Sequence, residues 1–355
     1  MMRIPRQVAS VWSGRARGPV PTPARGAPPA MMRAAVLVLA LAAAVVAACG
    51  GGSSSASGVV FPTVISLGGC DVCPAIRNTT LGVGLNRVVI GLDDAKLQPI
   101  LDAQVHVRFY DLTGRKPVFS SQTGTTFEPV QLSFINEDAH NQKVVTGNDG
   151  VYVAYATFDR AGTWGAQIDV TRAGKKLKPI PYTFTVLERT PEPAIGDPAP
   201  PSRQITLANV RDISEIDSSF PPRPAMHEIT VADALKTGKP IVVAFATPAF
   251  CTSRTCGPIM DTVMDPLAAK YAGQAIFIHI EPYDLQALRD TGQQVPVPAM
   301  RQWGLESEPW VFVVDRYGRI AAKYEGIATA AEVGQALERV LAQAPGTPAA
   351  GAPAP

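Results

Sequence analysis

Between residues 59 and 188 the hydrophobic positions fall into short runs that alternate with polar positions or are rich in β-branched and aromatic residues. Side chains of an extended strand point alternately to opposite faces, so this spacing predicts β-strands. Asn148-Asp149-Gly150 and Arg172-Ala173-Gly174 are typical of turns. The predicted strands are residues 87–92, 104–110, 129–135, 151–158, 164–170 and 182–187. Because no useful helical spacing occurs here, the segment predicts an antiparallel β-sandwich over residues 59–188.

The pattern changes after a proline-rich segment, residues 189–203. Proline removes backbone donors and holds the chain extended, so this segment is predicted to be a linker. Strand and helix patterns then alternate over residues 204–344. Apolar runs predict strands at 241–246 and 275–281 and a hairpin of 310–315 with 319–325, whereas 257–271 has helical spacing.

Two further helices are predicted from their first residues. Thr230 and Thr329 each precede an acidic residue by three positions, which is typical of a helix start, and the second helix is expected to end near residue 343. The resulting order, β-α-β-α-β-β-α, predicts an α/β domain.

Two segments of this domain resemble thioredoxin-like proteins of the redoxin and TlpA type. Residues 239–260 read KPIVVAFATPAFCTSRTCGPIM and are similar to the family's strand, active-site turn and helix. Residues 308–326 read EPWVFVVDRYGRIAAKYEG and are similar to its cis-proline loop and final hairpin. The resemblance implies that Cys251 is the nucleophile, that Cys256 is the resolving thiol and that Pro309 follows a cis peptide bond beside the sulfur atoms.

A weaker resemblance concerns the preceding segment. Residues 150–171, GVYVAYATFDRAGTWGAQIDVT, resemble the penultimate hairpin of bacterial immunoglobulin-like domains of the YtkA and FixH kind. Such domains mostly present surfaces or act as spacers. The expected fold class is therefore an all-β immunoglobulin-like sandwich followed by an α/β thioredoxin-like domain.

The spacing of the cysteine pair departs from the family pattern. Four residues separate Cys251 from Cys256, where the related oxidoreductases usually have two. On one regular helix the two Cα atoms would lie about 8.6 Å apart, beyond the limit of about 6.8 Å for a disulfide, so residues 252–255 must form a non-helical loop if the bridge closes. A cysteine at a helix N-terminus favours its thiolate, and Arg254 could add to that effect. An alternative alignment places Cys256 on the family's first cysteine, so the two roles remain interchangeable.

An alternative hypothesis is copper binding of the Sco kind through Cys251, Cys256 and His279. Thiolates suit Cu(I), and imidazole suits either copper state. In Sco proteins the histidine lies nearer the final hairpin, and no histidine follows His279 in this chain. A buried, hydrogen-bonded core histidine therefore explains His279 better, and we predict no metal and no cofactor.

Four other polar residues have two interpretations each. Glu281 and Asp284 lie at the end of the predicted strand at 275–281, either as solvated loop acids or as a proton relay to a buried thiol. His106 and His140 have no ligand-like neighbours in sequence and are interpreted as surface or structural residues.

Cys70 and Cys73 form a second close pair. A metal site would need further ligands nearby, and none follows in this segment, so a short structural disulfide is the expectation. An electron relay to Cys251 and Cys256 is the alternative.

The N-terminal segment resembles a bacterial lipoprotein signal. Arg33 precedes fifteen small or apolar residues, too few to span a bilayer. The run ends in VAAC at Cys49, which resembles a lipobox and implies that Cys49 is lipidated. We therefore expect a leader and signal peptide over residues 1–48 and a Gly/Ser tether over residues 49–58. The second Met-Met-Arg sequence, at residues 31–33, suggests that translation starts at Met31 or Met32. Residues 345–355 are expected to be a disordered tail.

Composition agrees with export and excludes one class of partner. Of the 355 residues 46% are apolar, enough for two cores, and the four cysteines beyond Cys49 suit a compartment that permits disulfides. The formal charge is +2, but six arginines and no acid precede Cys49, which leaves 26 basic and 30 acidic residues and a net charge of −4. A nucleic-acid partner is not expected, because it would need a dense positive surface.

The sequence thus predicts an extracytoplasmic thiol-disulfide oxidoreductase anchored to the cell membrane by a lipid. Its expected partners are exported thiol or disulfide proteins and a membrane redox partner. The direction of electron transfer depends on the potential of the cysteine pair, which sequence does not determine. The alternatives are a copper-handling lipoprotein and a non-catalytic scaffold with a structural disulfide.

Overall fold

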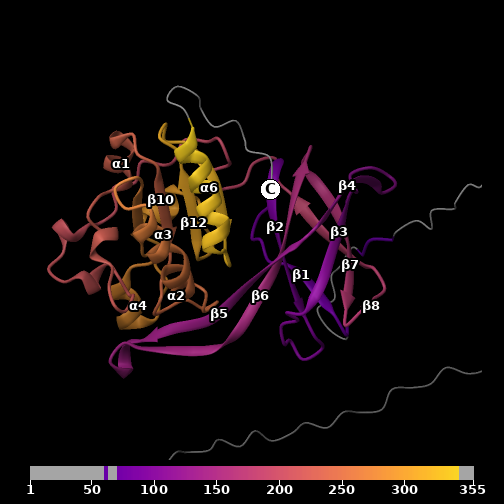
Figure 1. Ribbon diagram of the computed structural model, residues 1–355, viewed down its shortest axis with the longest axis horizontal. Helices are drawn as coiled ribbons and strands as arrows, with labels where there is room; N and C mark the ends of the chain where they lie inside the picture. The colour runs from indigo at the N-terminus through magenta and orange to yellow at the C-terminus, as the bar shows by residue number, and fades with distance from the viewer. Residues whose placement is uncertain (1–59, 63–69, 344–355) are drawn as a thin grey trace, which may run out of the picture. The chain divides into compact units, whose positions relative to one another are not determined.

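The computed structural model describes residues 60–62 and 70–343, which belong to the unit of residues 56–355 (Figure 1). The predicted leader and signal peptide (1–48), the tether (49–58) with Cys49, and the tail (345–355) lie outside the described residues. Among the described helices, none is long and apolar enough to cross a membrane.

Residues 70–186, called the β region below, contain two antiparallel sheets. The first sheet has the order β1-β2-β6-β5, with β1 at Cys73–Ile76, β2 at Gly84–Asp93, β6 at Gln142–Phe158 and β5 at Thr126–Asn136. The second has the order β4-β3-β7-β8, with β9 also paired to β7; these strands are Val118–Gly124, Ala103–Asp111, Gly162–Arg172, Lys175–Lys176 and Ile180–Val186. A short 3-10 helix, Glu137–Ala139, connects β5 and β6.

One hydrophobic core lies between the two sheets of the β region. It includes Val88 and Ile90 of β2 on one side and Val107 and Phe109 of β3 on the other, and all four are fully buried. Each pair is spaced by two residues, so the alternation read from the sequence does place these side chains on the inward faces. Burying each of them contributes about 1.5–3 kcal/mol.

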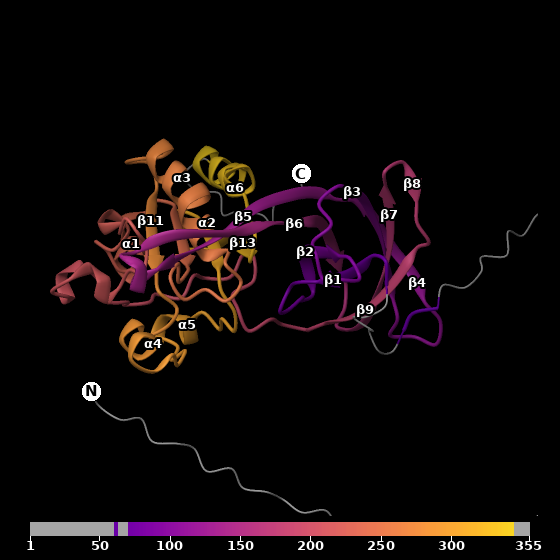
Figure 2. The same cartoon turned by 90° about the horizontal axis from the view of Figure 1, so that it is seen from below.

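The predicted turn at Asn148-Asp149-Gly150 is wrong, because these residues continue β6 in register with Val130 and its neighbours on β5. Two features keep the strand extended. A register shift at Leu132/Ser133 accommodates the extra residue, and Gly150 leaves room for the Phe127 ring, which a Cβ would meet at 2.5 Å. β5 and β6 therefore form a hairpin much longer than the sequence pattern predicts (Figure 2).

Residues 190–343, called the α/β region below, contain a sheet of order β11-β10-β12-β13. Strands β10 and β11 are parallel and the other pairs are antiparallel. The strands are β10 at Ile241–Phe245, β11 at Ile276–Ile280, β12 at Trp310–Val314 and β13 at Ile320–Glu325. They agree with the four strands expected from the sequence.

Six α-helices accompany this sheet: α1 at Val231–Ala234, α2 at Cys256–Ile259, α3 at Asp265–Lys270, α4 at Leu285–Thr291, α5 at Pro298–Gln302 and α6 at Ala330–Ala342, among the described residues. A π-helical turn, Met260–Met264, joins α2 to α3, so the helix predicted at 257–271 is nearly continuous. The 3-10 helices are Leu207–Asn209, Ile213–Glu215, Pro224–Met226 and Leu235–Thr237. Thr230 and Thr329 accept hydrogen bonds from the backbone of Asp233 and Glu332, as the predicted caps require.

Both faces of the sheet in the α/β region are covered by helices. Val242 and Ala244 of β10 share a core with α2, α3 and α6, whereas Ile241, Val243 and Phe245 share a core with α1, α4 and α5. Figure 2 shows α4 and α5 on the side of the sheet opposite α2, α3 and α6. A strand buried on both faces has apolar side chains at every position, which explains the unbroken apolar run of β10.

The predicted linker is not a free spacer. Gly196 and Ala199 donate backbone hydrogen bonds to the carbonyl oxygens of Ile320 and Gly318, at 2.8 Å each. Ile320 in turn donates to the carbonyl oxygen of Asp197 at 2.9 Å. The proline-rich segment is therefore bonded to the turn before β13 and to the first residue of that strand.

Candidate functional site

The loop between β10 and α2 carries the predicted cysteine pair. Phe245, the last residue of β10, pairs with Trp310, the first residue of β12. Because these strands are antiparallel, the loop after Phe245 and the residue before Trp310 lie at the same edge of the sheet. That residue is Pro309, and the Glu308–Pro309 peptide bond is cis, as expected.

Cys251 and Cys256 form a disulfide, and their Cα atoms are 5.9 Å apart. The bridge closes because residues 252–255 form a non-helical loop, in which Arg254 has a positive φ of 61°. Helix α2 begins at Cys256, whose N–H donates to Sγ of Cys251 at 3.2 Å. The Ser253 hydroxyl also lies 3.2 Å from this sulfur atom. A backbone N–H at a helix start stabilises negative charge, so the geometry favours a thiolate at Cys251.

Both sulfur-bearing residues are buried, Cys251 at 1% exposure and Cys256 at 0%. Strand β5 contributes to this cover through two backbone hydrogen bonds. Ser133 donates to the carbonyl oxygen of Arg254 at 3.0 Å, and Ile135 donates to that of Pro248 at 3.2 Å. We call the segment from Thr126 to Phe158, which is β5, β6 and their connection, the covering hairpin.

Side chains add to the attachment of the covering hairpin. The guanidinium of Arg254 lies 3.9 Å from the ring centre of Phe134, so this side chain contacts the hairpin. Glu137 forms a two-bond ion pair with Arg289 of α4, at 2.6 and 2.8 Å. Lys143 pairs with Asp261 of the π-helical turn. The hairpin is thus held on both sides of the cysteine loop.

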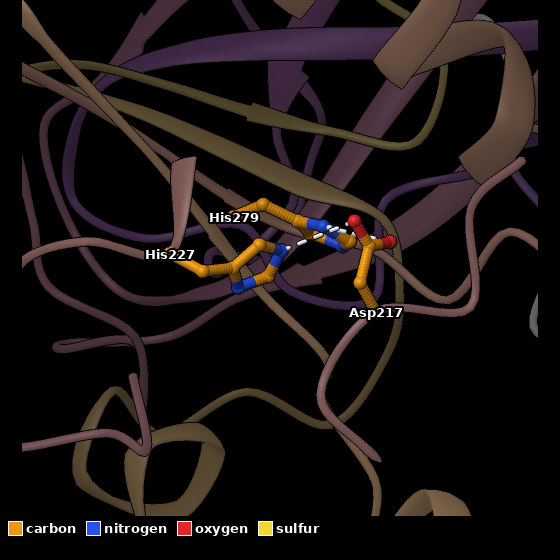
Figure 3. A group of neighbouring side chains, drawn as sticks. All are labelled: Asp217, His227 and His279. Carbon is orange, nitrogen blue, oxygen red and sulfur yellow. Dashed lines mark ion pairs between the residues drawn. The ribbon is translucent and has the colours of Figure 1, made fainter. Parts of the chain in front are cut away.

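A second cluster of polar side chains lies in the same region. Asp217, His227 and His279 each have an exposed fraction of 3% or less, and Figure 3 shows the two imidazole rings facing the carboxylate. Nε2 of His227 is 3.3 Å from Oδ2 of Asp217, and Nδ1 of His279 is 3.6 Å from Oδ1. Among the described residues, this is the only group of three His, Cys, Asp or Glu residues whose ligand atoms lie within 4.8 Å of one another.

The three residues of this cluster come from different elements. His279 belongs to β11, His227 follows the 3-10 helix Pro224–Met226, and Asp217 lies in the loop after Ile213–Glu215. Of the three residues only His279 was expected from the sequence, as a buried core histidine, and the structure does bury it. Asp217 and His227 were missed because the segment between the linker and β10 has no regular hydrophobic spacing.

Hydrogen bonds from the backbone fix the Asp217 carboxylate, since Ser219 and Arg223 donate to it at 2.8 and 2.7 Å. Burial opposes the charge of Asp217, but the adjacent His227 and His279 rings and the hydrogen bond from Ser219 hold the pKa of its carboxyl well below the usual value. Burial lowers the pKa of His279 to about 4.

Glu281 and Asp284 have separate roles. Glu281 is buried next to His279 and accepts a hydrogen bond from the backbone of Ser218 at 2.7 Å; burial and the nearby Asp217 raise the pKa of its carboxyl to about 8. Glu281 is therefore no solvated loop acid. Asp284 caps α4 by accepting from the backbone of Ala287 at 2.9 Å, which assigns it a structural role.

The other candidate residues are placed away from this loop. Cys70 and Cys73 form a disulfide at the start of β1, with Cα atoms 5.5 Å apart. His106 lies on β3, and His140 follows the 3-10 helix in the connection between β5 and β6. The copper hypothesis joined His279 to the two cysteines of the loop, whereas the structure gives His279 Asp217 and His227 as neighbours.

A cavity of about 730 Å³ borders the polar cluster. Its walls include His227, His279 and Glu281, together with residues of α4 and α5. Two of the three cluster residues, His227 and His279, therefore border a cavity although little of their surface is exposed.

Comparison with known proteins gives only distant similarities. No protein-family model matches the chain, and no curated protein was found to be similar. Two solved structures from Chlorobium tepidum, one bearing the name thiol:disulfide interchange protein DsbE and one described as a thiol:disulfide interchange protein of the thioredoxin family, are 19% and 20% identical. Each alignment covers 42% of this chain and 99% or 98% of the other, with TM-scores of 0.28 and 0.27.

A third solved structure, described as a thioredoxin-like superfamily protein, is 20% identical over 33% of this chain and 88% of its own, with a TM-score of 0.22. The names of the second and third neighbours refer to thioredoxin, and that of the first refers to thiol-disulfide interchange. Similarity at this level does not assign an activity to the present chain.

Proposed function

We propose that the protein is a thiol-disulfide oxidoreductase that acts through Cys251 and Cys256. The observation that carries the proposal is the disulfide itself, formed across the start of α2 with the N–H of Cys256 donating to Sγ of Cys251. The position of Pro309 at the same edge of the sheet as the cysteine loop supports it. In this proposal the α/β region is a thioredoxin-like domain.

The exchange would proceed in two steps. In the reduced protein the thiolate of Cys251 attacks a disulfide of the partner, forms a mixed disulfide and releases one partner thiolate. The thiolate of Cys256 then attacks Cys251, which re-forms the internal bridge and releases the second partner thiolate. Two electrons pass to the partner, and the reverse sequence oxidises it. The hydrogen bond to Sγ favours Cys251 as the attacking sulfur, and the opposite assignment remains the alternative.

The remaining sequence predictions enter the proposal unchanged. Lipidation at Cys49 would anchor the protein outside the cytoplasm, and its partners would be exported thiol or disulfide proteins and a membrane redox partner. The β region would be an immunoglobulin-like domain, and its role would include covering the cysteine pair. The contacts of the covering hairpin with Arg254 and Pro248 support that role.

The burial of both cysteines favours a second candidate function, a scaffold in which the bridge between Cys251 and Cys256 is only structural. A buried sulfur atom cannot be attacked until its cover moves. The two candidates therefore differ in whether the covering hairpin opens under native conditions.

The reduction potential of the pair separates the two candidates. We would equilibrate the full chain, with Cys70 and Cys73 changed to serine, in glutathione and dithiothreitol buffers and label the free thiols. An exchange catalyst should show a reversible two-electron transition between about −120 and −270 mV, and a structural bridge one below about −300 mV. The wild-type chain, labelled and digested into peptides, checks that the serine variants leave this transition unchanged. A potential below −300 mV would overturn the proposed exchange.

A further inference from the structure

The atoms at the centre of the cluster of Asp217, His227 and His279 are unsatisfied. Nε2 of His227 and Nδ1 of His279 are both buried and make no hydrogen bond, although each faces the Asp217 carboxylate. Buried polar atoms are nearly always hydrogen-bonded, because an unpaired one has lost its hydrogen bonds to water without replacement. Two such atoms directed at one carboxylate therefore need an explanation.

The orientation of His279 shows which kind of partner is missing. Its Nε2 lies 2.9 Å from the carbonyl oxygen of Ala246. A carbonyl oxygen only accepts, so Nε2 carries the hydrogen, and Nδ1 of the neutral ring presents a lone pair. This lone pair faces Oδ1 of Asp217, which is also an acceptor, at a distance too long for a hydrogen bond. Two buried acceptors facing each other are stable only with a cation or a donor between them.

The spacing of the ligand atoms suits a metal ion. At bond lengths of about 2.0–2.1 Å, tetrahedral coordination places neighbouring ligand atoms about 3.3–3.4 Å apart. The nitrogen to oxygen distances in the cluster are 3.3 Å for His227 and 3.6 Å for His279. These two separations, each to a different oxygen of the carboxylate, are close to what a bound ion would require, and all three ligand atoms lie within 4.8 Å of one another.

The surroundings resemble those of metal ligands in two further respects. The carbonyl oxygen of Ala246 holds His279 in place, and the backbone N–H groups of Ser219 and Arg223 hold Asp217. Hydrogen bonds of this kind orient the ligands of metal sites and are typical of them. The cavity of about 730 Å³, which His227 and His279 help to line, supplies an access route.

From these observations we infer that Asp217, His227 and His279 form a binding site for a divalent transition metal ion, with Zn²⁺ as the first candidate. Two imidazoles and one carboxylate are ligands that zinc accepts, and the set contains no sulfur and too few oxygens for Mg²⁺ or Ca²⁺. The fourth position would be taken by a water molecule on the side of the cavity. The site uses neither Cys251 nor Cys256, so it is independent of the proposed exchange and distinct from the copper hypothesis.

Metal binding to the full chain with both disulfides intact tests this inference. The protein would be stripped with a chelator and titrated with Co²⁺ and then Zn²⁺ in a calorimeter and a visible spectrometer. We expect one equivalent of Co²⁺ to bind with the intense visible bands of a four-coordinate complex, and Zn²⁺ to displace it. X-ray absorption of the zinc-loaded protein should show nitrogen and oxygen neighbours and no sulfur.

Three variants make the assignment specific. Loss of a residue that only hydrogen-bonds to a metal ligand weakens binding by up to about 100-fold. Asp217→Asn and His227→Gln change the ligands themselves, so each should weaken binding by more than that. His106→Gln changes a histidine on β3, outside the cluster, and should leave binding unchanged. Circular dichroism establishes that each variant is folded. The inference is wrong if the oxidised wild-type chain binds no metal at one equivalent, if sulfur appears among the neighbours, or if folded Asp217→Asn binds as tightly as wild type.

Discussion

The backbone N–H of Ser133, on β5, donates to the carbonyl oxygen of Arg254, in the loop between the two bridged cysteines, at 3.0 Å. One hydrogen bond thus connects the β region directly to the residues that close the disulfide. Extended segments commonly dock on exposed backbone in this way, and main-chain bonds then supply much of the affinity. We therefore expect the covering hairpin to occupy the position through which a substrate would reach the sulfur atoms.

Weakening the hairpin's ion pairs should expose the disulfide more often. Glu137→Gln removes the pair with Arg289, and Lys143→Gln removes the pair with Asp261. Each pair is partly exposed and contributes about 0.5–1 kcal/mol. If the disulfide is reduced only when the hairpin opens, each variant should be reduced by dithiothreitol about two- to fivefold faster, measured by the appearance of labelled thiols.

A matched control exists in the same region. Asp169→Asn removes an ion pair of comparable exposure, with Arg108, between β3 and β7 and away from the cysteine loop. It should leave the reduction rate of Cys251–Cys256 unchanged. Equal acceleration in all three variants would show that the disulfide reacts through global unfolding, and the covering role of the hairpin would then be wrong.

Replacing Cys251 should separate catalysis from folding. Cys251→Ser removes the bridge to Cys256, and closing so short a loop contributes about 2 kcal/mol to the free energy of unfolding. The variant should therefore fold with reduced stability, measured by urea denaturation, and lose all exchange with a disulfide substrate. Cys70→Ser should keep the exchange. Full exchange by folded Cys251→Ser would contradict the proposed function.

The regular parts of the fold could be predicted because their spacing reflects burial. Val88 and Ile90 alternate with neighbours on β2, and β10 is apolar throughout because both of its faces are covered. The helix starts at Thr230 and Thr329 could also be predicted. In each, the threonine oxygen and the acidic residue whose backbone N–H it accepts from are only three positions apart. The non-helical loop of residues 252–255 followed from the reach of a disulfide alone.

The missed features depend on contacts that are remote in sequence. Strand β4 is mostly exposed, with Phe119 at 52%, so it has no apolar alternation to read. The long β6 passes through Asn148-Asp149-Gly150 because β5 pairs with it. The residues around this segment show no sequence pattern from which that pairing could be predicted. Asp217 and His227 lie next to His279 only because an irregular segment of the chain brings them there.

Stability should depend on pH through Glu325, at the end of β13. Burial raises the pKa of its carboxyl, and the negative charge of Glu192 raises it further, although Thr79 and Ser307 donate hydrogen bonds to it. Glu192 is itself paired with Lys323, whose Nζ lies 2.8 Å from its Oε1. A carboxyl whose pKa is higher in the folded state than in the unfolded state stabilises the fold fully only below the unfolded value of about 4.5, and this contribution is lost as the pH rises through the folded value.

Glu325→Gln removes this titration. We expect the free energy of unfolding of the variant, relative to wild type, to improve between pH 4 and pH 7, measured by urea denaturation at both values. Asp94→Asn is the control, because backbone hydrogen bonds from Gln98 and Lys96 lower the pKa of that exposed carboxyl. The free energy of unfolding of this variant, relative to wild type, should change with pH in the opposite direction. Parallel pH profiles for wild type and Glu325→Gln would contradict the prediction.

The two regions should also be coupled through a buried ion pair. Arg87 of β2 binds Glu332 of α6 with bonds of 2.9 and 2.8 Å, and it donates to the carbonyl oxygen of Ile327 at 2.9 Å. The side chains are 6% and 13% exposed, so neither charge is well solvated. Removing one partner leaves the other charge buried without compensation, which costs about 3–5 kcal/mol.

We therefore expect Arg87→Met to lower the free energy of unfolding by about 3–5 kcal/mol, measured by urea denaturation. The double variant Arg87→Met with Glu332→Leu should recover much of that loss, because it leaves no unpaired charge and fills the space with apolar groups. A double variant less stable than Arg87→Met would show that the pair contributes through its hydrogen-bond network, which includes Tyr155, rather than through charge compensation. The single variant should also speed the reduction of Cys251–Cys256, since α6 and β2 help to hold the β region beside the cysteine loop.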